Sequence, residues 1–196
     1  MTKLRENGIL INIILLIVTI TSIWGVLWSL VEWGIADQKY FTNQSNLIVA
    51  ITVLLFFVAK NNNKWFPYLA AIALVNITIT GIIFHVMLAT PPISFQSHLT
   101  HTLTPIFYVI FYFLCVKETI KIKQFWVLLI YPLLYVVFFL ITGPFTGFYP
   151  YGFMDVSENG LGNALQFIVL MMFPAIALLS FILIYLKNKI EKTIKG

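Results

Sequence analysis

The sequence predicts an all-α membrane protein, a single six-transmembrane-helix bundle that occupies residues 1–196. Hydrophobic residues make up 60% of the chain and charged residues only 10%, whereas roughly a quarter of a soluble domain is charged. Apolar runs of about 20 residues, the length that crosses a bilayer core, also recur along the whole chain. These two observations exclude a soluble domain, and the net charge of +5 therefore implies no nucleic-acid partner.

Six apolar runs predict the six helices. The first run follows Lys3 and Arg5 as a secretory signal would, but it is too long for one and lacks a small-x-small cleavage site. The connections between runs are short, except at 31–41 and 143–160. The predicted spans are 9–30, 42–60, 65–89, 97–116, 125–142 and 161–185.

The basic residues predict the orientation of the bundle. If the chain alternates sides from a cytoplasmic N-terminus, only Lys39 of the 12 basic residues falls outside. Loops rich in lysine and arginine stay in the cytoplasm, where they face anionic lipid, so both termini are predicted to be cytoplasmic. A composition rich in lysine, isoleucine and asparagine indicates a bacterial plasma membrane. The residues predicted inside are Lys3, Arg5, Lys60, Lys64, Lys117, Lys121, Lys123, Lys187, Lys189, Lys192 and Lys195.

Four polar side chains are predicted to lie in one layer near the outer membrane surface. Thr42 begins the second span, and His85 lies four residues before the outer end of the third. His98 and His101 lie in the first outer turns of the fourth span. A rise of about 1.5 Å per residue puts His85 and His101 about 6 Å inside their helix ends. Because ionisable residues within a membrane usually face the bundle interior or a wet cavity, this layer is the candidate functional site.

The fourth span carries the pattern SHLTHTLTP, in which His98 and His101 are three residues apart and share a helix face. Pro105 lacks the amide that would bond the carbonyl of His101, which leaves that carbonyl open to a side chain, substrate or water. The alternative is that these imidazoles and that of His85 only hold helices together. Zinc needs three or four ligands. Asp155 could supply a carboxylate, but from a loop that the sequence does not place, and no HExxH or comparable set is present, so neither a metal ion nor a cofactor is expected.

Two further features surround this layer. The second span opens with the polar row TNQSN, whose amides either join helices or line a polar cavity and face a developing oxyanion. The outer loop GPFTGFYPYGFMD combines glycine, proline and aromatic residues, which form either an interfacial belt or a lid. The candidate binding or orienting residues are therefore His85, His98, Asn43, Asn46, Tyr149 and Asp155.

The chemistry available in this layer is nucleophilic. A hydroxyl becomes a nucleophile when a base takes its proton, and histidine is the usual base near neutral pH. A threonine and a histidine at one depth on two helices therefore favour hydrolysis of an ester or amide that arrives from the lipid. Spacing alone does not distinguish Thr42 from Ser45, Thr100 or Thr102 as the nucleophile. A transporter or small-molecule binder, and a non-catalytic membrane assembly partner, are the alternative functions.

Three motifs, FTNQSNL, HLTHTLTP and TGFYPYGFMD, follow one another over residues 41–155. They resemble the androgen-induced and androgen-dependent TFPI-regulating protein family of multispan membrane hydrolases, which cleave fatty-acid esters of hydroxy fatty acids. The chain looks closest to the bacterial proline-rich six-span relatives of that family. The resemblance implies a threonine nucleophile at Thr42, a catalytic histidine at His101 and an acyl-ester substrate in the membrane.

Overall fold

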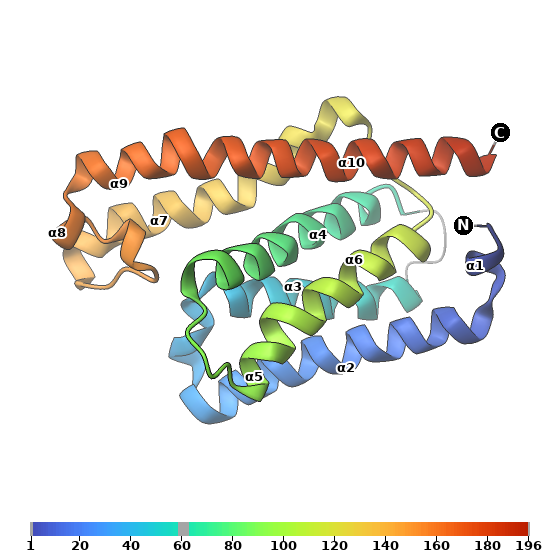
Figure 1. Ribbon diagram of the computed structural model, residues 1–196, viewed down its shortest axis with the longest axis horizontal. Coiled ribbons are helices and arrows are strands. Elements are labelled where there is room, and N and C mark those ends of the chain that lie inside the picture. Colours follow the sequence, from blue (N-terminus) through green and yellow to red (C-terminus); the bar gives the residue numbers. More distant parts are fainter. Residues whose placement is uncertain (1, 59–62, 196) are drawn as a thin grey trace.

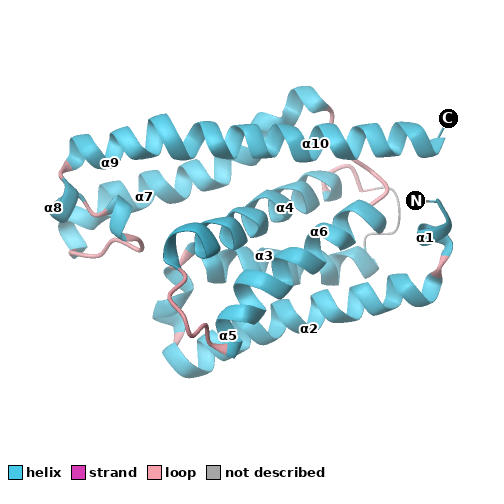
Figure 2. Cartoon of the chain, viewed as in Figure 1, coloured by secondary structure: helices cyan, strands magenta, loops and turns pink. Residues whose placement is uncertain are grey.

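The computed structural model describes residues 2–58 and 63–195. Within these ranges the chain folds into helices and loops without a strand (Figure 2), which confirms the predicted all-α class. The predicted end of the second span, Lys60, lies outside the described residues.

The described helices form six successive rods (Figure 1). They comprise residues 8–33, 41–58, 66–88, 95–114, 122–146 and 161–195. The third, fourth and sixth rods each contain a π-helical turn, and the fifth begins as a 3₁₀ helix. In chain order the elements are α1 (Thr2–Glu6), α2 (Gly8–Trp33), η1 (Ile35–Lys39), α3 (Phe41–Val58), α4 (Phe66–Ile83), η2 (Phe84–Leu88), α5 (Phe95–His98), η3 (Leu99–Leu103), α6 (Thr104–Leu114), η4 (Ile122–Leu129), α7 (Ile130–Thr146), η5 (Gly152–Met154), α8 (Val156–Asn159), α9 (Leu161–Phe167), η6 (Ile168–Met172) and α10 (Phe173–Lys195).

Four of the rods are long and apolar enough to cross a membrane, and they coincide with the first, third, fifth and sixth predicted spans. The second predicted span appears as a shorter apolar helix, Phe41–Phe56, and the fourth is divided among α5, η3 and α6. Helices of this length and composition are typical of an integral membrane protein. The four long rods are Gly8–Trp33, Phe66–Leu88, Ile122–Thr146 and Leu161–Ile194.

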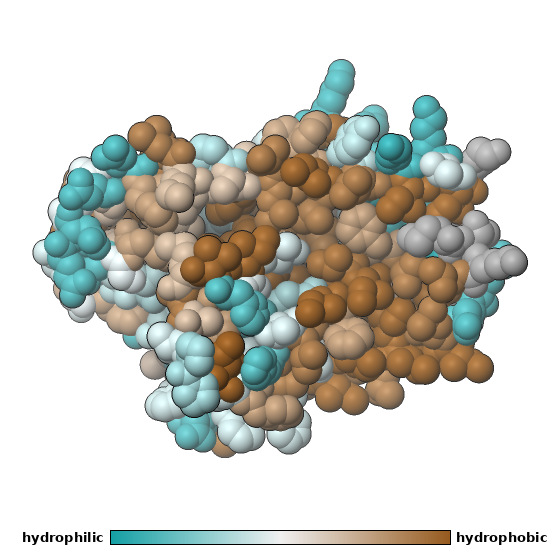
Figure 3. Space-filling view, viewed as in Figure 1, coloured by the Kyte–Doolittle hydropathy of each residue, from teal (hydrophilic) through white to brown (hydrophobic). Residues whose placement is uncertain are grey.

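Apolar side chains cover the outside of the rods as well as their interior. In the space-filling view, hydrophobic residues spread over the middle of the molecule, and many of the hydrophilic residues lie towards its two ends (Figure 3). On α2, for example, Trp24, Leu27 and Trp28 are exposed. Continuous apolar surface of this kind marks a membrane contact.

Helix α4 lies at the centre of the bundle, where it contacts α3, α6 and α10. Ala70, Ala71 and Ala73 are fully buried on it, and such small residues let neighbouring helices approach closely. The Tyr108 hydroxyl of α6 donates to the carbonyl of Ala70 at 3.1 Å. Helix α4 thus fixes the relative positions of α3 and of the rod α5–η3–α6, which carry the candidate site.

An ion cluster joins the two ends of the chain at one end of the bundle (Figure 1). Arg5 donates to both carboxylate oxygens of Glu191, at 3.0 and 2.5 Å. Lys187, which is fully buried, lies 2.7 Å from the same carboxylate. The Lys187 ammonium also donates to the carbonyls of Tyr112 and Val116, at the end of α6. The cluster therefore ties α1, α6 and α10 together.

A proline follows each of the three π-helical turns. Proline has no amide, and its ring clashes with the carbonyl four residues earlier, so a helix widens or bends ahead of it. The turn η3 ends two residues before Pro105, and η6 ends two residues before Pro174. The turn η2 ends three residues before Pro91. Each of these π-helical turns is thus followed by a proline within three residues, and one of the turns carries His101.

Candidate functional site

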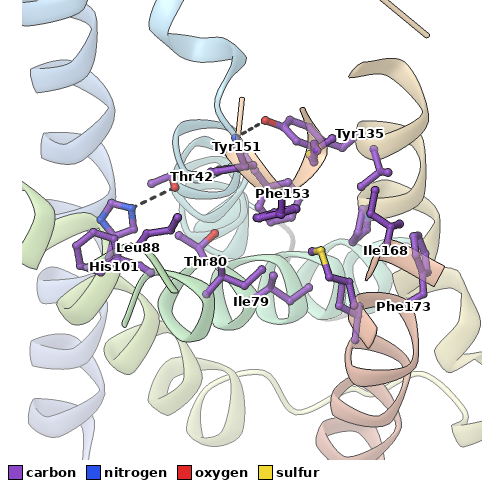
Figure 4. Close-up of a pocket in the computed structure, with 18 residues that line it drawn as sticks. Thr42, Ile79, Thr80, Leu88, His101, Tyr135, Tyr151, Phe153, Ile168 and Phe173 are labelled. Carbon is purple, nitrogen blue, oxygen red and sulfur yellow. Dashed lines mark hydrogen bonds between the residues drawn. The ribbon is translucent and has the colours of Figure 1, made fainter. Parts of the chain in front are cut away.

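The side chains of Thr42 and His101 meet between the second and fourth rods. Thr42 Oγ1 lies 3.2 Å from His101 Nε2, a hydrogen-bonding distance (Figure 4). Thr42 is the second residue of α3, and His101 is the middle residue of η3. The structure therefore brings together two of the groups that the sequence predicts at one depth.

The partners of the other imidazole nitrogen orient His101. Nδ1 lies 3.1 Å from the carbonyl oxygen of Ser97 and 2.9 Å from the Thr100 hydroxyl. Because a carbonyl only accepts hydrogen bonds, Nδ1 carries the proton and Nε2 presents its lone pair to Thr42. The ring of Phe84 stacks on the imidazole, with the ring centroids 3.9 Å apart. These contacts hold His101 in the orientation of a base towards the Thr42 hydroxyl.

Asn46 joins the two elements that carry this pair. Its side-chain amide donates to the carbonyl of Thr42 at 2.9 Å and to that of Thr100 at 3.3 Å. Asn46 is fully buried, so water does not compete for these hydrogen bonds. The contact holds α3 against η3.

The rest of the polar row on α3 faces away from the pair. The Asn43 amide donates to the Ser29 hydroxyl at 2.9 Å and to the Asp37 carboxylate at 2.7 Å. The Gln44 amide donates to the carbonyl of Gln38 at 3.1 Å. With about 3.6 residues per helical turn, five consecutive side chains point in all directions. Of the two alternatives for the row, joining helices and lining a polar cavity, these hydrogen bonds favour the first for Asn43 and Gln44.

A largely apolar cavity adjoins the Thr42–His101 pair (Figure 4). Side chains from α3, α4, α7, α10, the three π-helical turns and the loop after α7 form its wall. The polar members of the wall are Thr42, Thr80, His101, Tyr135 and Tyr151. The apolar members include Ile79, Ile83, Phe153, Ile168, Met172 and Phe173.

All three π-helical turns border this cavity. Turn η2 contributes Phe84 and Leu88, η3 contributes His101, and η6 contributes Ile168 and Met172. A π-helical turn is rare and recurs at functional sites. Three such turns from three separate rods converge here, which identifies the cavity as the candidate site without reference to any motif.

The cavity adjoins an apolar groove between α4 and the rod α9–η6–α10. Farther along this groove lie Val86 and Met171, both of which are exposed. The groove therefore opens on the outer surface of the helices and shares part of its lining with the cavity beside Thr42. The residues that line both spaces are Ile79, Ile83, Met172 and Ile176.

A second apolar groove reaches His101 between α4 and α6, where Ile106, Val109 and Ile110 form part of its lining. Gly81 permits this crossing of the helices, because an added Cβ would lie 3.2 Å from the carbonyl oxygen of His101. The carbonyl that Pro105 leaves without an amide therefore faces α4.

His85 and His98 belong to a separate cluster. His85 Nε2 lies 2.9 Å from Thr102 Oγ1, which lies 3.5 Å from His98 Nδ1. His85 borders the second groove, and His98 is exposed. Of the three histidines, His101 is the one in contact with Thr42. Among the described residues, no three histidine, cysteine or acidic side chains are grouped to hold a metal ion.

The loop after α7 contributes Tyr151 and Phe153 to the cavity wall. Tyr149, which the sequence predicts as a binding residue, is not part of this wall and packs its ring against Gly143 of α7, with no room for a Cβ there. Tyr151 is not among the residues that the sequence predicts. The loop motif points to this segment as a whole, but it does not distinguish Tyr151 from the other aromatic residues as the one that faces the cavity.

Asp155, the other loop candidate, has a local structural contact. Its carboxylate accepts hydrogen bonds from the backbone amides of Ser157 and Glu158, at 2.8 and 3.2 Å, and so caps α8. The hydrogen bond from the Ser157 side chain also lowers the pKa of the Asp155 carboxyl. These contacts are typical of a helix N-cap, so Asp155 stabilises the local conformation of the loop at the start of α8.

Replacing Gly25 by alanine is expected to destabilise the protein by about 1–3 kcal/mol, the usual range for overpacking. The new Cβ would lie 2.6 Å from Cγ2 of Thr100, next to His101. Thr100→Ser removes that methyl group and keeps the hydroxyl. Thermal unfolding in detergent should therefore show a smaller effect of Gly25→Ala in the Thr100→Ser background, and equal effects in both backgrounds would contradict the packing described here.

Comparison of the chain with protein-family models, with curated proteins and with solved structures gives no significant match.

Proposed function

We propose that this chain is an intramembrane lipid hydrolase that cleaves an ester of a fatty-acyl substrate, with Thr42 as nucleophile and His101 as base. The observation that carries the proposal is the 3.2 Å contact between Thr42 Oγ1 and His101 Nε2 beside an apolar cavity. A hydroxyl, an imidazole and a third group that orients the imidazole form the usual arrangement of an activated nucleophile. Here the carbonyl of Ser97 is the third group.

The reaction proceeds in two halves. Thr42 Oγ1 attacks the acyl carbon, its proton passes to His101 Nε2, and the π electrons of the carbonyl move onto the carbonyl oxygen. The intermediate collapses as the ester bond to the alcohol breaks, and the alcohol oxygen takes the proton from His101. Water then attacks the acyl-threonine with the same base, which releases the acid and regenerates Thr42. The Ser97 carbonyl stabilises the imidazolium formed in each half.

The two grooves support an ester with apolar groups on both sides. The acyl chain occupies the cavity and the adjoining groove between α4 and the rod α9–η6–α10. The alcohol part of the substrate occupies the groove between α4 and α6. His101 borders both spaces, so we place the ester bond beside His101 and one apolar group of the substrate in each space. This arrangement suits a membrane lipid rather than a water-soluble substrate.

We further propose six membrane crossings with both termini in the cytoplasm of a bacterial cell, which places the site near the outer surface. The distribution of 12 basic residues, with Lys39 alone on the outer side, supports this orientation. The hydrogen bonds between Arg5 and Glu191 hold the two chain ends next to each other, which supports an even number of crossings.

The resemblance to the androgen-induced and androgen-dependent TFPI-regulating protein family leads to the same proposal. Its motifs select Thr42 and His101, the two residues whose side chains lie within hydrogen-bonding distance. We therefore propose that the chain is a distant member of this family, nearest to its bacterial six-span relatives.

Replacing His101 by asparagine is expected to slow labelling by a fluorophosphonate probe in native membranes by about 10²–10⁴-fold, the usual contribution of a general base. His98→Asn serves as the matched control, since its side chain does not contact Thr42 and lines neither the cavity nor the two grooves, and it should label at nearly the wild-type rate. Equal losses in both variants, or an unlabelled wild type, would contradict the proposal.

A further inference from the structure

Ester hydrolysis requires a hydrogen-bond donor for the carbonyl oxygen that becomes negatively charged, and the donors nearest to Thr42 in the sequence are engaged elsewhere. The side-chain amides of Asn43, Gln44 and Asn46 donate to other parts of the protein. The backbone amide of Phe41 donates to the Tyr135 hydroxyl at 2.9 Å. The other groups of the cavity wall that can donate are hydroxyl groups.

Apart from Thr42, three residues of the cavity wall carry a hydroxyl group. The Thr80 hydroxyl donates to the carbonyl of Asn76 on its own helix, at 3.0 Å. The Tyr135 hydroxyl donates to the carbonyl of Lys39 in η1, also at 3.0 Å, so its proton is already engaged in a hydrogen bond. The third hydroxyl is the phenol of Tyr151.

Tyr151 lies beside Thr42 in the cavity (Figure 4). Its hydroxyl interacts with the side chain and the backbone amide of Thr42. Its ring stacks on Phe153 with centroids 5.4 Å apart and meets the Tyr40 ring edge to face at 6.4 Å. These contacts fix the ring, and burial raises the pKa of the Tyr151 phenol, so the oxygen keeps its proton and can donate it in a hydrogen bond.

We propose that Tyr151 is a further catalytic residue, whose phenol donates a hydrogen bond to the carbonyl oxygen of the bound ester. The proposal rests on the hydrolase function proposed above. As Thr42 Oγ1 bonds to the acyl carbon, the carbonyl oxygen gains an electron pair and becomes a stronger acceptor for the Tyr151 hydroxyl. When the alcohol leaves, that pair re-forms the carbonyl double bond, and Tyr151 has kept its proton throughout.

An interaction that strengthens in the transition state raises kcat more than it lowers KM. Purified full-length Tyr151→Phe is therefore expected to hydrolyse 4-nitrophenyl dodecanoate with a kcat on the order of 10²-fold below that of the wild type and with nearly the same KM. Phenylalanine keeps the ring contacts with Phe153 and Tyr40 and loses only the hydroxyl contacts with Thr42, so the thermal unfolding midpoint should fall by no more than a few degrees. Tyr149→Phe is the matched control from the same loop, and it should keep the wild-type kcat.

The thionoester analogue of the same substrate separates a catalytic from a structural effect. Its sulfur accepts hydrogen bonds weakly, so the wild type should prefer the oxygen ester, and Tyr151→Phe should lose most of that preference. An active wild type with unchanged kcat, or an unchanged preference, in Tyr151→Phe would overturn the role of Tyr151 and leave the hydrolase proposal intact. A wild type that neither hydrolyses the ester nor reacts with the fluorophosphonate probe would overturn both.

Discussion

Replacement of Thr42 by alanine is expected to reduce ester hydrolysis on the order of 10⁴-fold, the scale seen when a nucleophile or its base is removed from a hydrolase. The substitution deletes the one oxygen that lies 3.2 Å from His101 Nε2. The loss should fall on kcat, because the apolar cavity and grooves that bind the chains stay in place. The loss of kcat can be measured from steady-state hydrolysis of a long-chain ester by the purified variant.

Two controls make this result specific. Thr42→Ser keeps the hydroxyl and should retain measurable hydrolysis. Thr19→Ala removes a hydroxyl that bonds only the carbonyl of Leu15 on its own helix, and it should behave as the wild type does. Full activity in Thr42→Ala would refute the proposed nucleophile and would return the choice to Thr100, Thr102 or Ser45.

Replacement of Glu191 by alanine is expected to destabilise the protein by about 3–5 kcal/mol, because it leaves a buried positive charge without its partner. Lys187 is fully buried, and Arg5 also loses both of its hydrogen bonds to the carboxylate. The fall in the thermal midpoint, roughly 10 °C for a chain of this size, can be followed in detergent by the loss of the monodisperse protein peak.

Lys192→Ala is the matched control, since Lys192 is exposed on the next residue of the same helix. It should leave the midpoint unchanged, whereas Lys187→Met in the Glu191→Ala background should recover part of the loss. A Glu191→Ala protein as stable as the wild type would show that the cluster does not hold α1, α6 and α10 together.

The all-α class and the proximity of Thr42 and His101 could be predicted from the sequence, because both follow from helix periodicity and length. Apolar runs predict helices, and a fixed rise per residue places Thr42 and His101 at one depth. The internal structure of the fourth span could not be predicted in this way. Its apolar run is interrupted by polar residues, and the structure divides it among α5, η3 and α6. Its π-helical turn, η3, was not foreseen, although Pro105 marks it.

The cavity wall could not be predicted, because it depends on how the rods pack against one another. Five adjacent polar residues suggest one polar surface, yet the helix turns Asn43 and Gln44 away from the cavity and leaves Thr42 in it. Within the outer loop, Tyr149 and Tyr151 are two residues apart and equally aromatic. The turns of the loop direct one towards α7 and the other towards Thr42, which no pattern in the sequence specifies.

The contact between Thr42 and His101 is most directly tested by locating the covalent adduct. Wild-type protein labelled with a fluorophosphonate in native membranes can be digested and analysed by mass spectrometry. We expect a phosphonylated Thr42, which is lost in Thr42→Ala and strongly reduced in His101→Asn. An adduct on any other residue, or none at an exposure that labels a known serine hydrolase fully, would contradict it.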